Sequence, residues 1–219
     1  VTHAMTTDDS NGTRHLTERA AAGDQDALAQ LFVRYRGRLA RMVHLRMDRR
    51  LQGRVDPSDV LQEAYIELAR RLPDYVRQPS LPFFLWLRMV TGQRLLQIHR
   101  RHLGTAMRDA GRDLTLYSGA LPEATSMSLA AHLLGRLTTA SQAVMRAELR
   151  LQLEEALNGM EPMDREVLAL RHFEDLTNNE VAETLGISKA AASKRYVQAL
   201  RRLRKVLSNI PGFVNDMRP

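Results

Sequence analysis

Seven cationic side chains and no acidic one lie between Ser188 and Lys205, in the last part of the chain. They are Lys189, Lys194, Arg195, Arg201, Arg202, Arg204 and Lys205. A helix whose charges all have one sign can pair with the phosphates of a nucleic acid, while its small polar side chains reach base edges. The simpler alternative is a solvated basic face.

The residues just before this run favour a helix, a tight turn and a second helix. Asn178 or Asn179 is expected to cap the first helix, and Ser188 the second. Gly186 stands between them, and glycine readily takes the left-handed backbone conformation of a helix end. The apolar face of the first helix is formed by Val181, Ala182 and Leu185. Residues 176–205 therefore predict a helix-turn-helix that binds DNA.

A second group of cations lies in the first half of the chain, where arginines follow aromatic residues. The aromatic residues are Tyr75, Phe83, Phe84 and Trp86, and the arginines are Arg88, Arg94, Arg100 and Arg101. Bases stack on aromatic rings while guanidinium groups contact phosphates, so this combination suits single-stranded nucleic acid. Aromatic rings more commonly form a core, and we expect at least two of these to do so.

An acidic strip precedes the aromatic group. Asp59, Gln62, Glu63 and Glu67 recur at helical spacing in one predicted helix. The expected buried face of this helix consists of Val60, Leu61, Ala64, Tyr65, Ile66, Leu68 and Ala69. Such a strip can dock on a basic partner. It can also be solvated surface, or pair with arginines of the preceding helix.

Composition limits the classes of protein that the chain can represent. Its 219 residues carry 32 Lys and Arg against 25 Asp and Glu, a net charge of +7, which suits a polyanionic partner. The absence of cysteine excludes disulfides, thiolate metal sites and cysteine nucleophiles. No apolar run has the length of a membrane span, and the first residues lack the apolar core of a signal peptide, so we expect a cytoplasmic protein with no membrane insertion.

The elements that must position these residues are all predicted to be helices, because no segment alternates β-branched and polar residues. Asp24 and Asp56 are expected to cap the first two helices, and a third is predicted from Phe83 to about Leu103. Apolar residues that recur at helical spacing predict the buried face of the first helix, and they are Ala27, Leu28, Leu31, Phe32, Tyr35, Leu39, Met42 and Val43. Residues 72–82 contain three prolines and are predicted to form a loop. Residues 104–147 have weak periodicity and predict a linker with helical patches, one of them at 129–137.

Enzyme signatures are lacking in the sequence. There is no G-x-x-x-x-G-K loop for phosphates, and no serine in a nucleophile elbow. His99 and His102 have the spacing of a ligand pair, but they lie in an arginine run without a nearby carboxylate, so surface positions or phosphate contacts are expected. We expect no catalytic residue, no metal and no cofactor.

The order of these pieces resembles the sigma-70 family of bacterial RNA polymerase sigma factors, in particular the extracytoplasmic-function (ECF) group. Residues 59–65, DVLQEAY, are similar to the polymerase-binding motif of the family. Trp86-Leu87, with Arg100-Arg101 further on, looks like its helix for promoter melting and minus-ten reading. Residues 160–171 and the helix-turn-helix are similar to the module that reads the minus-thirty-five element.

The resemblance implies two small helical domains joined by a flexible linker. The domain boundaries that follow are a disordered tail at 1–15, an N-terminal sigma domain at 16–104, a linker at 105–147, a helix-turn-helix domain at 148–208 and a tail at 209–219. It also implies core RNA polymerase as a partner, through its beta-prime and beta subunits, together with double- and single-stranded promoter DNA and an anti-sigma factor. A helix-turn-helix regulator with an N-terminal sensing or dimerisation domain is the alternative function.

The resemblance assigns three sets of site residues, and in the minus-ten set the loop 75–80 would hold one extruded base. The polymerase-binding set is Asp59, Gln62 and Glu63. The minus-ten set is Tyr75, Arg77, Trp86, Arg94, Gln97, Arg100 and Arg101. The minus-thirty-five set is Ser188, Lys189, Ala190, Ser193, Lys194, Arg195, Arg201 and Arg202, of which the three arginines would hold phosphates. Because residues 190–192 are alanines, the sequence predicts no base preference for this helix.

Overall fold

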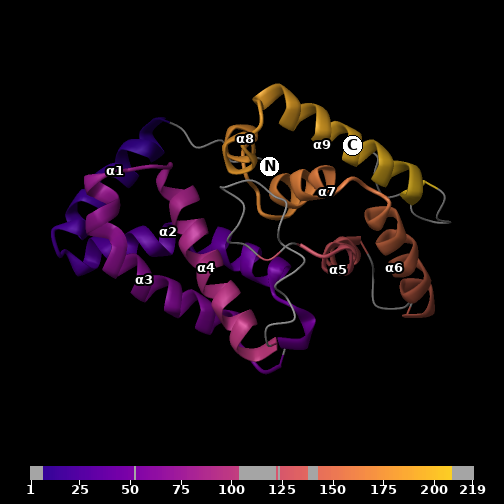
Figure 1. The fold of residues 1–219 in the computed structure, drawn as a ribbon, viewed down its shortest axis with the longest axis horizontal. Helices are drawn as coiled ribbons and strands as arrows, with labels where there is room; N and C mark the ends of the chain where they lie inside the picture. The colour runs from indigo at the N-terminus through magenta and orange to yellow at the C-terminus, as the bar shows by residue number, and fades with distance from the viewer. Residues whose placement is uncertain (1–6, 52, 104–121, 123, 138–142, 209–219) are drawn as a thin grey trace. The chain divides into compact units, whose positions relative to one another are not determined.

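The computed structural model describes residues 7–51, 53–103, 122, 124–137 and 143–208. Every regular element within these ranges is a helix, which confirms the prediction of an all-α protein. The chain divides into two compact units, Val1–Pro122 and Glu123–Pro219 (Figure 1). The predicted tail at 209–219 and the predicted linker from 105 to 121 lie outside the described residues.

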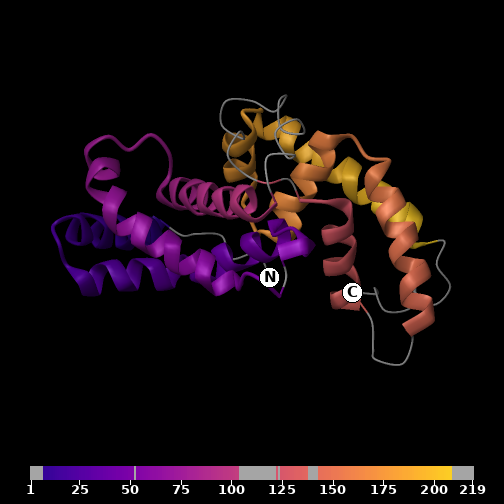
Figure 2. The same ribbon diagram turned by 60° about the horizontal axis from the view of Figure 1, so that its bottom comes forward.

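The first unit contains four α-helices and one 3-10 turn. They are α1 (Thr7–Ala21), α2 (Gln25–Arg46), η1 (Arg49–Leu51), α3 (Pro57–Arg77) and α4 (Phe83–Leu103). Helix α2 packs against the other three α-helices, and α3 also lies along α4 (Figure 2). The fully buried side chains of this core include Leu31, Leu39, Met42, Leu68, Leu72, Leu87 and Leu95. Helical periodicity had identified the buried face of α2 correctly.

Helix α1 overturns the prediction of a disordered tail at 1–15, apart from residues 1–6, which are not described. Thr13 is buried, and its hydroxyl lies 2.8 Å from the Tyr35 hydroxyl of α2. The Arg34 guanidinium donates a hydrogen bond to the same Thr13 oxygen at 3.1 Å. Polar contacts with α2 thus hold a helix that has no apolar stripe for pattern analysis to detect.

Helix α3 continues through Pro73, although residues 72–82 were predicted to be a loop. A proline inside a helix removes one backbone hydrogen bond, at a cost of about 3 kcal/mol. Packing on both sides of Pro73 offsets this cost, because Leu72 is buried and the Tyr75 ring stacks on Trp86 with 4.5 Å between ring centroids. The connection to α4 is therefore only residues 78–82.

The caps predicted at Asp24 and Asp56 are confirmed, since each carboxylate accepts a backbone hydrogen bond from the first turn of its helix.

The second unit contains α5 (Ser126–Leu137), α6 (Ala143–Asn158), α7 (Pro162–Leu168), the π-helix η3 (Ala169–Phe173), α8 (Asn178–Leu185) and α9 (Lys189–Leu207). Helix α5 packs on α6, while α6, α7 and α8 all contact α9. Part of the range predicted as linker is thus an ordered helix, whose buried face includes Leu129, Ala130, Leu133 and Leu134. This agrees with the helical patch predicted at 129–137.

The boundary between the units falls inside the range predicted as linker, 105–147. Pro122 belongs to the first unit, where its carbonyl accepts a hydrogen bond of 2.9 Å from the buried guanidinium of Arg46.

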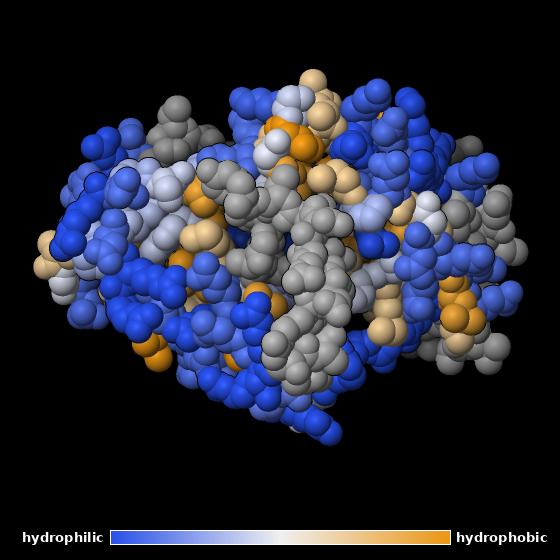
Figure 3. Space-filling model, in the orientation of Figure 1, coloured by the Kyte–Doolittle hydropathy of each residue, from blue (hydrophilic) through white to orange (hydrophobic). Residues whose placement is uncertain are grey.

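On the face that Figure 3 shows, hydrophilic side chains predominate and apolar ones are scattered. Among the described helices, none combines the length and the apolar character required to cross a bilayer.

Candidate nucleic-acid interface

The turn between α8 and α9 has the geometry that the sequence predicted, except at its first cap. Thr177 caps α8, not Asn178 or Asn179. Its hydroxyl accepts a hydrogen bond from the Glu180 backbone N–H, and the Glu180 carboxylate accepts one from the Thr177 N–H. This capping box was readable as Thr-x-x-Glu in the sequence. Gly186 has a φ of 64°, which is the left-handed conformation expected of it.

Small side chains let α8 and α9 pack closely. Ala182 on α8 and Ala192 on α9 are both buried, and Ala192 is completely so. The Asn178 amide crosses the turn and donates a 2.9 Å hydrogen bond to the Lys189 carbonyl. Ser188 caps α9 as predicted, because its hydroxyl accepts a hydrogen bond from the Ala191 N–H at 3.1 Å. The start of α9 is therefore fixed in direction by backbone and cap contacts.

The first two turns of α9 expose the residues that were predicted to face the major groove. Ser188, Lys189, Ala190, Ser193 and Lys194 are all exposed. Ala190 and Lys194 lie on the side of the helix opposite the buried Ala192, Ser193 lies beside them, and Ser188 and Lys189 lie at the start of the helix. The helix N-terminus also carries a partial positive charge, so this surface favours an anion.

Arg195 differs from these residues because its guanidinium is paired within the unit. It donates to Asp164 on α7 at 2.7 Å and lies 3.3 Å from the Glu161 carboxylate. Asp164 is buried, and the Arg202 guanidinium lies 3.9 Å from its carboxylate, although Arg202, like Arg201, is exposed. The hydrogen bond to Asp164 raises the pKa of Arg195. Sequence reasoning missed Asp164, because an acid in the first turn of a helix is usually explained by the helix dipole alone.

In the first unit, the aromatic residues form a core cluster. The Tyr75 ring stacks on Trp86, Phe83 lies 5.8 Å from Trp86 between ring centroids, and Phe84 stacks on Tyr35 at 5.5 Å. Trp86 is only 7% exposed. The expectation that at least two of these rings are core is confirmed. Trp86 belongs to that core and does not present its ring to solvent.

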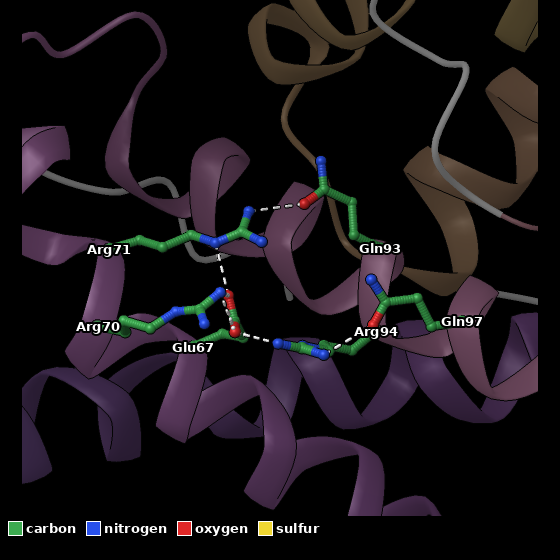
Figure 4. A network of polar contacts seen from close by, with 6 residues as sticks. All are labelled: Glu67, Arg70, Arg71, Gln93, Arg94 and Gln97. Atoms are coloured by element: carbon green, nitrogen blue, oxygen red, sulfur yellow. Dashed lines mark hydrogen bonds and ion pairs between the residues drawn. The ribbon is translucent and has the colours of Figure 1, made fainter.

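A buried carboxylate organises the arginines on α3 and α4 (Figure 4). Glu67 binds Arg70 at 2.8 Å, Arg71 at 2.5 Å and Arg94, which lies 27 residues away. Desolvation acts to raise the pKa of Glu67, but the hydrogen bond from Arg94 and the three positive charges outweigh it, and the pKa is lowered. Glu67 therefore does not belong to an exposed acidic strip.

Two glutamines complete this network. Arg71 donates to the side-chain oxygen of Gln93 at 2.8 Å, and Arg94 donates to that of Gln97 at 2.7 Å. Gln97 is otherwise exposed, as are Arg100 and Arg101 at the end of α4. The remaining members of the predicted minus-ten set lie at the end of α3. They are Tyr75, whose hydroxyl donates to the Leu81 carbonyl, and exposed Arg77, which pairs with Asp74 at 3.1 Å.

The predicted polymerase-binding residues lie on the outer side of α3. Asp59 and Gln62 are exposed, and Glu63 is half-buried. Gln62 borders an open hollow of about 310 Å³ between α2 and α3, whose other lining residues are Phe32, Arg36, Ser58, Leu61, Tyr65 and Ile66. Ile66 is one of the most exposed large apolar side chains among the described residues. Sequence patterning had placed Ile66 on the buried face of this helix, which is wrong.

The histidine pair is split between core and surface. His99 is 1% exposed and accepts a hydrogen bond from the Asp48 N–H at 3.3 Å, so the expected surface position is wrong for this residue. Burial lowers the pKa of His99 and favours its neutral form. His102, one turn later, is exposed. Among the residues that the structure describes, no three His, Asp or Glu side chains are grouped as metal ligands would be.

Comparisons with known proteins agree on one family. Residues 156–205 match the family Sigma-70, region 4. The ECF RNA polymerase sigma factor SigD of Mycobacterium tuberculosis is 26% identical over 185 residues, which are 84% of this chain and 79% of SigD. RNA polymerase sigma factor CarQ of Myxococcus xanthus is 28% identical over 200 residues, covering 88% of this chain and 96% of CarQ.

Two further proteins extend this comparison. The ECF RNA polymerase sigma factor BldN of Streptomyces coelicolor is 23% identical over 207 residues, which are 94% of this chain and 70% of BldN. The solved structure of CnrH in complex with the cytosolic domain of CnrY shares the fold, with a TM-score of 0.52 and 22% identity. The match covers 90% of this chain and 98% of CnrH.

Proposed function

Because the chain is a sigma factor of the extracytoplasmic-function group of the sigma-70 family, we propose that separate surfaces of its two units hold promoter DNA and core RNA polymerase. A sigma factor binds core polymerase and directs it to promoters for transcription initiation. The observation that carries the proposal is the exposed face of α9, which begins at a capped turn and lies in the region matched by the family. The assignment of the individual surfaces follows from the chemistry of their residues.

The face of α9 is proposed to read the minus-thirty-five element in the major groove. Lys189 and Lys194 would contact phosphates or guanine edges, and Ser188 and Ser193 would donate or accept hydrogen bonds. Exposed Arg201 would contact the backbone further along the helix. Arg195 would reach a phosphate only after it leaves Asp164, whereas exposed Arg202 would be available for a backbone contact.

The end of α3, the connection 78–82 and α4 are proposed to hold the opened minus-ten strand. Gln97, Arg100 and Arg101 are exposed along α4 and suit phosphates and base edges. The base pocket that the family resemblance places at 75–80 would be formed mainly by residues 78–80, since Tyr75 and Arg77 lie in α3. Trp86 would support this pocket from the core. Capture of an extruded base, which costs a few kcal/mol, would separate the strands without any bond chemistry.

The outer side of α3 is proposed to dock on core polymerase. Asp59, Gln62 and Glu63 would complement a basic surface of the beta-prime subunit, while the second unit would contact the beta subunit. Exposed Ile66 beside Gln62 would add apolar contact, as the centre of a stable interface requires. Since polymerase and promoters occur together in the cytoplasm, we place the protein there.

A protein inhibitor is proposed as a further partner. CnrH has been solved in complex with the cytosolic domain of CnrY, and the fold of CnrH matches most of this chain. An anti-sigma factor that covered the outer side of α3 would exclude core polymerase. Co-expression with candidate partners, followed by competition against polymerase, tests this part of the proposal.

Run-off transcription with core polymerase on genomic fragments tests the proposed function as a whole. We expect the protein to form a complex with core polymerase in the absence of DNA, and to start transcripts at defined positions that core polymerase alone does not use. A regulator without sigma activity would bind DNA fragments but would neither join core polymerase nor start such transcripts, and that result would refute the proposal.

A further inference from the structure

We propose that Glu67, Arg70, Arg71 and Arg94 form one binding site for a backbone phosphate of DNA, with Glu67 as the residue that positions the three guanidinium groups. This inference rests on the proposed function, because the site lies between α3 and the DNA-contacting side of α4. It adds Arg70 and Arg71 as phosphate ligands. The proposal also assigns a positioning role to the buried Glu67, which neither the family match nor the sequence patterns assign.

The burial of the four side chains is graded. The Glu67 side chain is 3% exposed, whereas those of Arg94, Arg71 and Arg70 are 23%, 36% and 68% exposed. The anion is therefore inside and the cations form a rim around it, as Figure 4 shows. Solvent and ligands can reach the arginines but not the carboxylate.

The charges do not balance within this cluster. One carboxylate faces three guanidinium groups, which leaves an excess of two positive charges. A single arginine is sufficient to pair a buried carboxylate, and an exposed partner such as Arg70 contributes little to stability. Helix α4 contains no acid that could neutralise the excess, and Asp74, four residues after Arg70 on α3, is exposed and paired with Arg77 at 3.1 Å. The cluster consequently attracts an external anion.

The hydrogen-bonding groups of the cluster point to the same ligand. The acceptors are occupied internally, because Glu67 accepts from three arginines and the oxygens of Gln93 and Gln97 accept from Arg71 and Arg94. Each guanidinium has five N–H donors, so these internal contacts use only part of the donors of each group. A rim in which donors outnumber acceptors fits a phosphate, which guanidinium groups bind in a bidentate manner.

DNA is the favoured source of this phosphate. Arg94 lies on the same helix as the exposed Gln97, Arg100 and Arg101, so a strand that follows α4 brings consecutive phosphates to these cations. Phosphate contacts do not depend on base sequence, and each one steepens the dependence of DNA affinity on salt concentration. An acidic protein segment is the competing ligand, and the experiment separates the two.

The test uses the full chain and a fluorescent DNA duplex with a single-stranded overhang, with affinity measured at several salt concentrations. Arg70→Gln and Arg71→Gln are each expected to weaken binding several-fold and to lower the salt slope by about one. The control is Arg14→Gln, which removes an exposed arginine of α1 that is paired with Glu18. Variants with the affinity and slope of the control would overturn the phosphate site.

Glu67→Gln tests the positioning role, because charge and geometry predict opposite results. The substitution raises the net charge by one, which favours DNA binding if only charge matters. If Glu67 positions the guanidinium groups, its substitution disorders them and weakens DNA binding. We expect this second result, with DNA affinity several-fold lower and a salt slope that is unchanged or lower. Thermal unfolding checks that the variant is folded, and Arg71→Lys, which keeps the charge but loses the planar fork, provides a second variant with the same expected direction. Tighter DNA binding by Glu67→Gln would refute the positioning role.

Two further measurements separate this inference from the proposed function. If wild-type protein starts no transcripts while Arg70→Gln and Arg71→Gln still weaken DNA binding, the phosphate site stands and the proposed function fails. If these variants bind DNA normally but lose core polymerase in co-purification, the ligand is an acidic protein surface, and the assignment to DNA is refuted.

Discussion

Helices α4 and α9 are both assigned to promoter DNA, yet they hold their cations differently. On α4, Arg94 is held by the buried carboxylate of Glu67, and Trp86 belongs to the core. On α9, Lys189 and Lys194 are exposed in the first two turns, with positions fixed only by the helix itself. One surface is a set of arginines arranged around an internal anion, and the other is a set of flexible side chains on a rigid backbone.

This difference corresponds to two ways of binding DNA. Guanidinium groups that are already ordered lose little entropy when a phosphate arrives, which suits a strand that must be held while it is open. Lysines with rotatable stems adapt to different positions of the duplex backbone, which suits docking in a groove. We therefore expect the first unit to contribute fixed contacts and the second to contribute adaptable ones.

The comparison assigns DNA to α4 and α9 and core polymerase to the outer side of α3. Reversing the charges of Asp59 and Glu63 to lysine is expected to produce the largest effect. Like charges facing each other across an interface cost several kcal/mol, so affinity for core polymerase should fall about 100-fold. Binding of the full chain to DNA without polymerase should not weaken, and a co-sedimentation assay with core polymerase measures the first effect.

The control for this reversal is Glu18→Lys, at an exposed acid on α1 that is paired with Arg14. It should leave polymerase affinity near the wild-type value. Equal loss of polymerase and DNA binding in the double reversal would show that these surfaces do not have separate tasks.

Asp164 and Glu67 are both buried acids that bind arginines, but we expect their neutralisation to change DNA affinity differently. Asp164→Asn removes the charge that binds Arg195, and we expect a loss of about 2 kcal/mol in the free energy of unfolding of the second unit. DNA affinity should be unchanged or higher, since Arg195 is released. Chemical denaturation and DNA binding measure the two effects, with Glu161→Gln, at an exposed carboxylate 3.3 Å from Arg195, as the control. A drop in DNA affinity like that expected of Glu67→Gln would remove the contrast.

The exposed lysines of α9 should give a smaller effect on DNA than the polymerase reversal gives on its partner. Lys189→Ala combined with Lys194→Ala is expected to weaken binding to the upstream promoter element about tenfold and to lower the salt slope by about two. Lys205→Ala, at the far end of the same helix, is the matched control. If the variant with both lysines replaced keeps wild-type DNA binding and in vitro transcription, the DNA-binding face of α9 has been assigned wrongly.

The smallest expected effect is a pH dependence of the first unit. Burial lowers the pKa of His99 below that of an ordinary histidine, so the unfolded chain binds a proton more readily than the folded one. Stability should be complete above about pH 6.5 and decrease as the pH falls below that value toward the folded pKa. Urea unfolding at several pH values measures it. His99→Gln should flatten the dependence whereas His102→Gln should not, and a dependence unaffected by His99→Gln would contradict the assignment.

The sequence predicted those features whose causes lie within a few residues. Asp24, Asp56 and Gly186 mark helix ends through contacts in the adjacent turn, and each was identified correctly. The buried face of α2 followed from periodicity alone. The exposed face of α9 followed in the same way, because cap and period together determine which side of a helix is free.

Apart from the Thr177 cap, which is local and was assigned to the wrong residue, most features that escaped prediction depend on partners far away in the chain. Glu67 meets Arg94 across 27 residues, and Asp164 meets Arg195 across 31. Helix α1 is held by the contact between the Thr13 hydroxyl and the Tyr35 hydroxyl on α2. Helix α3 continues beyond Pro73 because the Tyr75 ring stacks on Trp86 of α4. A single sequence contains the residues of such pairs but not the folded geometry that brings them together.

The three consecutive alanines of α9 differ in burial, and this difference affects which of them can change as promoter preference evolves. Ala192 is completely buried against the rest of the unit, so any larger side chain there would disturb the packing of the helix. Ala190 is exposed beside Lys189 and Lys194 and is unconstrained by the core. In the proposed role of α9, a mutation at Ala190 would add a base contact without loss of stability, and a lineage would acquire new target promoters while the rest of the unit stayed unchanged.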